Sequence, residues 1–255
     1  MIKKVVPFRV NFETLRMINL AGSIILYSSA LLTLLIVLDR HFNFLLSNDI
    51  QQIMNSVLSF LSIIYFLEDL LQNYLFQLAE VHRRNDFLDN SLETTLADKN
   101  SEGYFSNDSL DSGVYKLGVN SFENSFFTKS LTSSMLTPMI IKSTIIILLF
   151  IFLVLFTDNV TLSILMQVAL PLTILQQSIR LITLHLRVEF VFNQFKMIFS
   201  SINSPKQDSY LITNVINYES TLAWGGILLD SNIYNKRNET LSQEWEDIKA
   251  KHSIK

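Results

Sequence analysis

The sequence predicts an all-α membrane protein whose four transmembrane helices form two hairpins. In the second hairpin, the uncharged runs 143–157 and 159–179 are 15 and 21 residues long, and Asp158 alone separates them. A bilayer core about 30 Å thick needs about 20 apolar residues in one helix. The first run reaches that length if it starts near Met139 and if Lys142 extends its charged end to the headgroups. A buried hairpin in a soluble protein is the alternative, but this run has no polar face for water.

The first hairpin follows a polar N-terminal segment, residues 1–16. Residues 17–38 form an uncharged run of 22 residues, and residues 50–67 form a second uncharged run of 18 residues. A secretory signal peptide is the alternative for the first of these runs. Its apolar region would be shorter, however, and a small-residue cleavage site would follow it. We therefore expect a retained first transmembrane helix.

The second helix of each hairpin is expected to extend into the cytoplasm. Beyond each apolar run, apolar residues follow in alternating steps of four and three, the heptad spacing of helices that pack in coiled coils. The extended helix of the first hairpin is expected to reach about Arg84. That of the second is expected to end before Pro205, because the residue before a proline avoids the helical region. Charged residues at Val191 and Phe195 are predicted to disrupt oligomers and to leave insertion intact. The first heptad seam consists of Phe60, Ile64, Leu67, Leu71, Tyr74, Leu78 and Val81, and the second of Leu184, Val188, Val191, Phe195, Ile198 and Ile202.

The placement of lysine and arginine predicts the orientation, since cytoplasmic segments carry an excess of these residues. Residues 1–16 contain four of them, residues 83–129 contain five and the residues after Leu186 contain eight, whereas the two hairpin turns contain only Arg40. We therefore expect a multi-pass protein of the bacterial inner membrane with both termini in the cytoplasm. Its expected parts are a cytosolic N-terminus 1–16, a hairpin 17–84, a cytosolic insert 85–136, a hairpin 137–202 and a cytosolic helical tail 203–255.

The cytosolic segments are expected to be helical. Asn90 and Asn120 each precede a glutamate by three residues, the capping-box arrangement that begins a helix. Residues 101–113 are the expected loop. In the tail, one helix is expected to end at the glycine pair 225–226, and another to begin with a capping box at Thr240.

The composition excludes several functional classes. The chain has no cysteine, which rules out disulfides, thiolate zinc sites and cysteine nucleophiles. A net charge of -3 gives no indication of nucleic-acid binding. The sequence contains no P-loop, dinucleotide-binding, metalloprotease or serine-hydrolase motif. We therefore expect neither an enzyme nor a bound cofactor or metal.

Two neighbouring acids, Glu68 and Asp69, directly follow the second apolar run. Ionisable residues at membrane depth usually face a bundle interior or a water-filled path. The alternative is that the span ends at Leu67 and that both acids lie among the headgroups. Together with the polar residues nearby, the candidates for a pore or gate are Glu68, Asp69, Gln72, Gln176, Gln177 and Arg180.

A pair of arginines, Arg83 and Arg84, forms a second candidate site. Two guanidinium groups beside polar side chains could bind a phosphate or an acidic partner. The alternative is a positively charged helix end that complements the helix dipole and anchors the cytoplasmic side of the membrane.

Two stretches of the middle segment have the character of family signatures. Residues 83–91 read RRNDFLDNS, and residues 120–128 read NSFENSFFT. With these stretches, two hairpins, a moderate insert and a helical tail, the chain resembles the small four-span membrane effectors of bacterial antiphage defence systems. The resemblance covers the whole chain and is mainly architectural, so it transfers no functional residue. It implies an oligomer that permeabilises the inner membrane when a cyclic nucleotide or a partner sensor triggers it.

The expected function is therefore that of an oligomeric effector that disrupts or permeabilises the membrane when it is triggered from the cytosol. The alternative is a non-conducting membrane anchor or immunity-type protein that recruits a soluble partner. An intramembrane enzyme or transporter is disfavoured, because neither paired catalytic residues nor broken helices are present. The expected partners are membrane lipid, further copies of the chain, and a cytosolic sensor protein or a small nucleotide signal.

Overall fold

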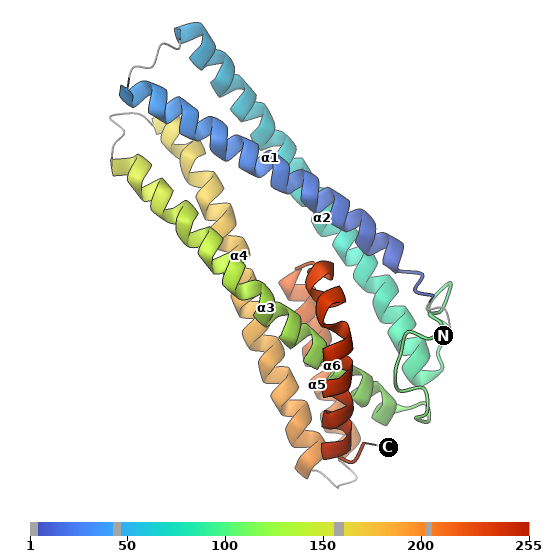
Figure 1. Ribbon diagram of the computed structural model, residues 1–255. Helices are drawn as coiled ribbons and strands as arrows, with labels where there is room; N and C mark the ends of the chain where they lie inside the picture. The colour runs from blue at the N-terminus through green and yellow to red at the C-terminus, as the bar shows by residue number, and fades with distance from the viewer. Residues whose placement is uncertain (1–4, 43–46, 156–160, 202–205, 255) are drawn as a thin grey trace. The chain divides into compact units, whose positions relative to one another are not determined.

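A computed structural model describes residues 5–42, 47–155, 161–201 and 206–254. Within these residues the chain forms six α-helices (Figure 1), which confirms the predicted all-α class. The helices are α1 (Arg9–Phe42), α2 (Asn48–Leu92), α3 (Val114–Leu155), α4 (Thr161–Ser201), α5 (Gln207–Gly225) and α6 (Ser231–Lys251).

Three helices of the described part are long and apolar enough to cross a membrane. Their candidate spans lie in Arg9–Ile36, Asn48–Leu92 and Val114–Leu148. The sequence predicts four such spans, so the membrane-embedded class is supported and the number four is not confirmed. The fourth expected span, 159–179, falls largely on α4 residues whose side chains lie outside the described part, as does the turn around Asp158.

Helix α2 confirms the expected continuous helix through and beyond the second apolar run. It contains 45 residues and neither proline nor glycine, so nothing in its backbone interrupts the hydrogen-bond ladder. The helix ends at Leu92 rather than near Arg84. Helix α4 ends at Ser201, before Pro205, as predicted.

The three predicted capping-box starts are wrong. Asn90 lies in the last turn of α2, and Asn120 and Thr240 lie inside α3 and α6. Residues that can cap a helix also occur within helices when the flanking residues continue the helical pattern. The start of α6 is capped by Asp230, whose carboxylate accepts hydrogen bonds from two backbone N–H groups of the first turn. The end of α5 is as predicted, with Gly226 in the left-handed conformation at a φ of 56°.

The chain forms two compact units, which we call the apolar unit and the packed unit. In the apolar unit, large apolar side chains are exposed on α1, α2 and α3, for example Met17, Ile53 and Ile145. Such outward-facing apolar surface is expected of helices that face lipid rather than water. The apolar unit comprises Glu13–Leu75 and Thr137–Ile179, and the packed unit comprises Met1–Phe12, Phe76–Leu136 and Arg180–Lys255.

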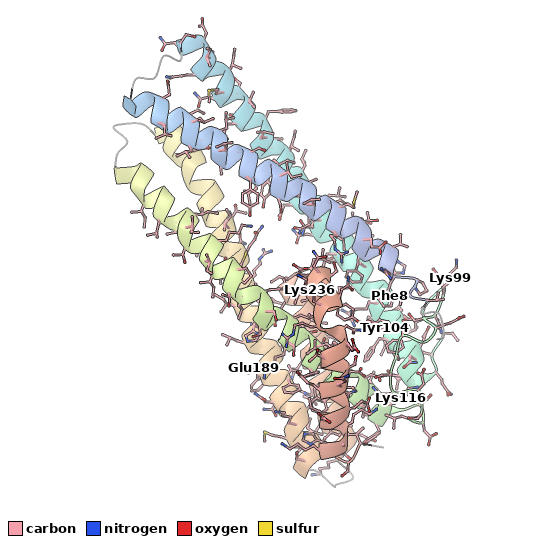
Figure 2. All side chains as sticks on the ribbon, viewed as in Figure 1. Phe8, Lys99, Tyr104, Lys116, Glu189 and Lys236 are labelled. Atoms are coloured by element: carbon pink, nitrogen blue, oxygen red, sulfur yellow. The ribbon has the colours of Figure 1, made fainter. Side chains whose placement is uncertain are left out.

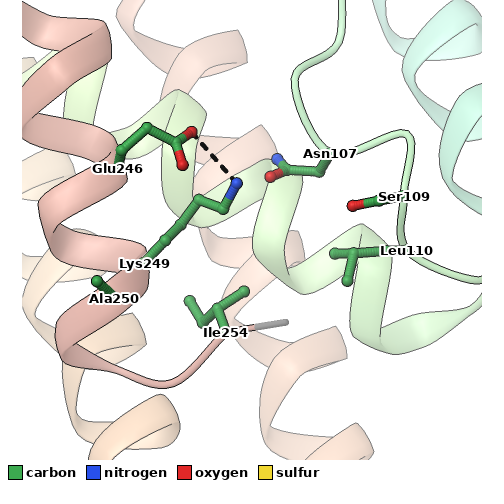
Figure 3. Close-up of a pocket in the computed structure, with 7 residues that line it drawn as sticks. All are labelled: Asn107, Ser109, Leu110, Glu246, Lys249, Ala250 and Ile254. Atoms are coloured by element: carbon green, nitrogen blue, oxygen red, sulfur yellow. Dashed lines mark hydrogen bonds and ion pairs between the residues drawn. The ribbon is translucent and has the colours of Figure 1, made fainter.

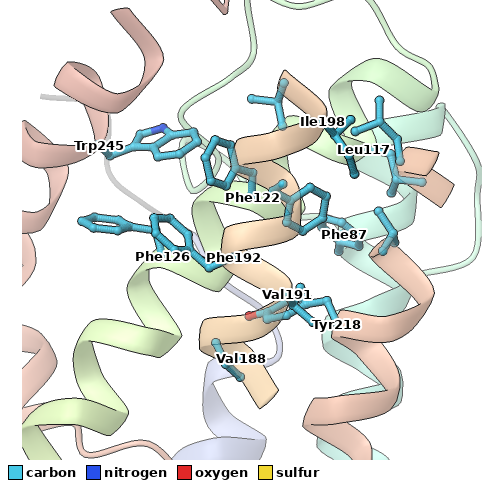
Figure 4. Packing of buried hydrophobic residues seen from close by; sticks show 14 of the residues in the cluster. Phe87, Leu117, Phe122, Phe126, Val188, Val191, Phe192, Ile198, Tyr218 and Trp245 are labelled. Atoms are coloured by element: carbon cyan, nitrogen blue, oxygen red, sulfur yellow. The ribbon is translucent and has the colours of Figure 1, made fainter. Parts of the chain in front are cut away.

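The packed unit has a hydrophobic core in which Phe122 of α3 is central (Figure 4). The Phe122 ring lies 5.3 Å from the ring of Phe192 on α4 and 5.2 Å from the ring of Trp245 on α6. Helix α5 contributes Tyr218, whose hydroxyl lies 2.9 Å from the hydroxyl oxygen of Thr128 on α3. Side chains of this size each contribute about 1.5–3 kcal/mol when fully buried, so α3, α4, α5 and α6 stabilise one another.

The second heptad seam lies inside this core, and we call it the closed seam. Asn214 of α5 covers part of it and donates a hydrogen bond to the backbone oxygen of Val191 at 3.0 Å. The expectation that Val191 and Phe195 lie at an oligomer interface is therefore wrong. Heptad spacing identifies a face that packs against another helix, but it does not reveal whether that helix belongs to the same chain. The described residues of the closed seam are at most 5% exposed: Leu184, Val188, Val191, Phe195 and Ile198.

The first heptad seam is uncovered on α2, and we call it the open seam. Phe60 and Tyr74 are 63% and 62% exposed, and Val81 is 48% exposed. Ile64 is half-buried, but the other residues of this seam are exposed, so the described helices leave most of this face uncovered. The face is available to lipid or to a second copy of the chain.

Carboxylates of α2 hold the loop formed by residues 93–113. Asp89 accepts a hydrogen bond from the backbone N–H of Leu96 at 2.8 Å, and Asp86 accepts one from the backbone N–H of Ser101 at 2.6 Å. Hydrogen bonds to charged groups contribute about 1.5–3 kcal/mol each. The loop is therefore fastened to the end of α2, although it contains no helix of its own.

The N-terminal segment packs on the same loop (Figure 2). Val5 and Glu102 exchange two backbone hydrogen bonds of 3.0 and 2.9 Å. The ring of Phe8 meets the ring of Tyr104 edge-on, with 5.7 Å between the centroids. The segment before α1 is thus part of the packed unit.

The two stretches that carry the resemblance pack against each other. Asn120 donates hydrogen bonds to Asn90 Oδ1 and Ser91 Oγ at 3.1 and 3.0 Å, and it accepts one from Asn107 of the loop at 2.9 Å. Buried networks of this kind fix a single arrangement, because an unpaired polar group in the interior is costly. The network therefore fastens α2, α3 and the loop together.

Candidate functional site

Polar side chains connect the four helix segments of the apolar unit in a closed ring of contacts, which we call the polar belt. Through these residues α1 contacts α2, α2 contacts α4, α4 contacts α3 and α3 contacts α1. In apolar surroundings an unpaired polar side chain is costly, so contacts between polar groups hold helices together. The belt consists of Asn19, Gly22, Tyr27, Tyr65, Glu68, Gln72, Lys142, Ser143, Gln177 and Ser178.

Two hydrogen bonds attach α2 to its neighbours in the belt. Gln72 Nε2 donates to Asn19 Oδ1 on α1 at 3.3 Å. Gln177 Nε2 on α4 donates to the Tyr65 hydroxyl at 3.4 Å. Both distances exceed the usual range for N–H···O bonds, so these contacts are weak and can exchange for contacts with water.

Helix α3 completes the ring. The hydroxyl groups of Ser143 on α3 and Ser178 on α4 are hydrogen-bonded to each other, and both side chains are buried. Lys142, which was expected to extend to the headgroups, has its ammonium nitrogen 4.6 Å from the centre of the Tyr27 ring on α1. A cation over an aromatic face is stabilised by the charge distribution of the ring.

Glu68 is the only belt residue described here whose polar atom is both buried and unpartnered. Its Oε1 atom is buried and has no hydrogen-bond partner among the described residues. Its carboxylate lies against Gly22 of α1, where an added Cβ atom would be 2.2 Å from Glu68 Oε2. Only glycine therefore leaves room for the carboxylate between α1 and α2.

The structure brings together three of the predicted pore or gate residues and separates the other three. Glu68, Gln72 and Gln177 belong to the polar belt. Asp69 and Gln176 are exposed, and Asp69 accepts a hydrogen bond from its neighbour Asn73 at 3.1 Å. Arg180 belongs to the packed unit and forms no ion pair with a described carboxylate. A role for these six residues in conduction remains a prediction.

The partners of the belt glutamate and glutamines were not identified from the sequence. Asn19, Gly22 and Ser143 interrupt otherwise apolar helices. Small and polar residues are enriched where membrane helices approach closely. Such residues could therefore be selected from the sequence as candidates for helix contacts, but their positions do not reveal which helix each of them contacts.

The predicted arginine pair lies in a cluster of ion pairs. Arg83 Nη2 is 2.6 Å from Glu219 Oε2 on α5 and 2.9 Å from Glu80 Oε2 on α2, and Arg84 Nε is 3.1 Å from the same Glu219 oxygen. Two carboxylates thus balance two guanidinium groups. A phosphate or an acidic partner would have to displace Glu219 before it could bind this pair.

A pocket of about 330 Å³ lies between the loop and the C-terminal end of α6 (Figure 3). The Lys249 ammonium is 3.2 Å from Glu246 Oε1, and the Asn107 side chain is fully buried with no partner for Oδ1. The pocket therefore offers polar groups but no unbalanced charge. Its lining residues are Asn107, Ser109, Leu110, Glu246, Lys249, Ala250 and Ile254.

Two further observations bear on the function of these sites: the arrangement of possible metal ligands and the comparison with known proteins. Among the described residues, no group of three histidine, aspartate or glutamate side chains is placed to hold a metal ion. No protein-family model, no curated protein and no solved structure matches the chain.

Proposed function

We propose that the chain is an effector of the bacterial inner membrane that oligomerises and permeabilises the membrane when it is triggered from the cytosol, in antiphage defence. A cytosolic sensor protein or a small nucleotide acts on the packed unit, and the helices of the apolar unit respond. The observation that carries the proposal is the Glu68 carboxylate between apolar helices, whose buried Oε1 atom has no hydrogen-bond partner among the described residues.

Glu68 supports the proposal because its present surroundings are unfavourable for a charge. An acidic residue within a membrane helix is costly, and such residues mark ion and water pathways. In an open state, water that enters between the helices would hydrate Glu68. Gln72 and Gln177 would exchange their long hydrogen bonds for water at the same time. The polar belt then represents the closed state.

The open seam supports oligomerisation. Its apolar residues repeat with heptad spacing, and most of them are exposed. Two copies that pack their open seams together would bury these side chains in a coiled-coil arrangement. Such contacts would place several copies of α2, each carrying Glu68, in one assembly.

The test compares Glu68→Gln with Asp69→Asn during over-expression in bacteria. A potential-sensitive dye reports depolarisation, and membrane fractionation reports insertion. Glutamine removes the charge that disfavours the closed state, so Glu68→Gln is expected to reduce depolarisation by at least about tenfold, the factor that corresponds to 1.4 kcal/mol. The exposed neighbour Asp69 serves as the matched control, and Asp69→Asn should depolarise like the unaltered chain.

Absence of depolarisation under every condition, including co-expression with genomic neighbours, would refute permeabilisation. An equal effect of both substitutions would instead show that the buried carboxylate has no special role. In either outcome the amount of inserted protein must match that of the unaltered chain.

The packed unit favours a second candidate function, a membrane anchor that recruits a soluble partner. It has its own hydrophobic core, so it is suited to hold a binding surface without any conducting path. Retention of a soluble partner by a chain that never depolarises the membrane would select this function.

A further inference from the structure

Helices α4 and α5 of the packed unit present an arginine stacked on an exposed tryptophan. Arg187 Cζ lies 4.4 Å from the centre of the Trp224 ring, and Trp224 is 51% exposed. Arg187 is also exposed and forms no ion pair with a described carboxylate. Stacking uses one face of the planar guanidinium, so its N–H donors stay free to bind an anion.

Two glycines position Trp224 in the last turn of α5. At Gly225, an added Cβ atom would lie 2.9 Å from Leu184 Cδ1, so α5 lies close against α4 directly after the tryptophan. Gly226 ends α5 in the left-handed conformation. The stacked pair is therefore a product of the packing between two helices.

The surface around this pair combines positive charge with apolar side chains. Leu186 and Phe190 of α4, one residue before and three residues after Arg187, are exposed. Arg180 precedes Arg187 by seven residues and thus lies on the same side of the helix. The nearest acid in the sequence, Glu189, is paired with Lys129 at 2.9 Å. The charge of Arg187 is therefore not balanced locally.

We propose that Arg187 and Trp224 bind the headgroup of an anionic phospholipid. A phosphodiester accepts paired hydrogen bonds from a guanidinium group, and tryptophan concentrates at membrane–water interfaces. An anionic lipid satisfies both parts of this surface, because its phosphate pairs with the free guanidinium and its acyl chains cover the apolar side chains.

The position along α4 agrees with a site at the headgroup level. The expected fourth span ends at Ile179, and eight further residues of helix advance about 12 Å. The headgroup layer extends about 5–8 Å beyond the hydrocarbon. A long arginine side chain that extends toward the interface covers the remaining distance.

Contact quenching of tryptophan fluorescence tests the proposal on the full chain in phospholipid vesicles. The vesicles contain phosphatidylcholine and phosphatidylglycerol, and one lipid at a time carries a nitroxide quencher at the top of its acyl chain, directly below the headgroup. The chain has two tryptophans, and Trp245 is buried in the packed unit, so contact quenching reports Trp224. Trp224→Phe should abolish it.

Phosphatidylglycerol that carries the nitroxide is expected to quench more strongly than phosphatidylcholine that carries it, at equal mole fraction. The expected enrichment of anionic lipid is about fivefold, the ratio that corresponds to about 1 kcal/mol for one arginine at an anionic surface. Arg187→Gln should remove this preference. The matched control is Lys196→Gln, which removes an exposed positive charge elsewhere on α4 and should retain the preference.

Four outcomes would overturn the proposal. Quenching by neither lipid, or equal quenching by both, would remove the anionic-lipid site. Loss of the preference on addition of inorganic phosphate would assign the site to a free anion. Because the chain has no cysteine, Trp224→Cys can report contact between copies, and an efficient disulfide between copies would assign this surface to self-association.

Discussion

The open seam of α2 and the closed seam of α4 have the same heptad spacing and opposite environments. In the open seam, Tyr74 is 62% exposed, whereas in the closed seam Phe195 is fully buried. The difference comes from the helices nearby. Helices α3, α5 and α6 of the same chain cover the closed seam, whereas the described helices leave most of the open seam exposed. The spacing alone therefore identifies a packing face but not its partner.

The polar residues near the end of α2 attach this helix to the rest of the packed unit. Arg83 and Arg84 reach Glu219 of α5, and Asp86 and Asp89 hold the loop. Helix α2 thus uses its polar residues for contacts within the chain. Its exposed apolar seam is available to lipid or to a second copy of the chain.

The largest difference is expected between Val191→Asp and Val81→Asp, which place a carboxylate at corresponding heptad positions of the two seams. In the closed seam, an unpaired charge in the core should destabilise the packed unit by more than about 4 kcal/mol. In the open seam, the change should stay within about 0.5 kcal/mol while the oligomer becomes smaller. Denaturant unfolding followed by fluorescence of the buried Trp245 measures the first effect, and detergent chromatography measures the second.

The interpretation of the two seams would be broken if Val191→Asp unfolded at the same denaturant concentration as the unaltered chain. An unchanged oligomer size with Val81→Asp would leave lipid as the occupant of the open seam.

Truncation of an aromatic residue in each seam should give a somewhat smaller contrast. Phe195→Ala leaves a cavity in a packed core and is expected to cost about 3–5 kcal/mol. Tyr74→Ala removes an exposed side chain and should leave unfolding of the packed unit nearly unchanged. Thermal and denaturant unfolding measure both variants, and similar losses for the two would contradict the different burial of the seams.

Removal of the Glu219 charge tests whether ion pairs hold the end of α2 in the packed unit. Glu219→Gln weakens two charge-assisted contacts to Arg83 and Arg84, so the packed unit should lose about 1.5–3 kcal/mol. Glu239→Gln on α6 changes an exposed acid and is the control, with an expected change within about 0.5 kcal/mol. Equal denaturant midpoints for the two variants would show that the ion pairs do not hold α2.

The smallest expected effect is the pH dependence that His252 gives to the stability of the packed unit. This residue lies at the edge of the core that contains the closed seam. Partial burial, together with Lys251 and Lys196, lowers the pKa of His252, whose Nδ1 lies 2.9 Å from Ser200 Oγ. The folded state therefore binds the proton less readily than the unfolded state. This contribution to stability is present above about pH 6.5 and declines as the pH falls through the unfolded-state pKa.

His252→Gln should consequently reduce the loss of stability between about pH 7 and about pH 5. The effect is small because the ring is only partly buried and water screens its charge. Denaturant midpoints across this range measure it, and an identical pH dependence in both proteins would exclude His252 as the cause.

The candidate site was only partly predictable from the sequence. Glu68 could be selected because an acid next to an apolar run is unusual. Its position against Gly22 could not, because that contact depends on the register between α1 and α2. Asp69 is one residue away in the sequence, but it lies on another side of the helix and is exposed.

The sequence by itself determined the features that local physics controls. Apolar runs determined the helical, membrane-embedded class, Pro205 set a limit for α4, and Gly226 set the end of α5, because hydropathy and backbone preferences act within a few residues. Only the tertiary structure decided which seam is closed and that Arg83 meets Glu219, 136 residues further along the chain. Such contacts depend on which helices lie side by side, and neither the spacing nor the composition of one helix contains that information.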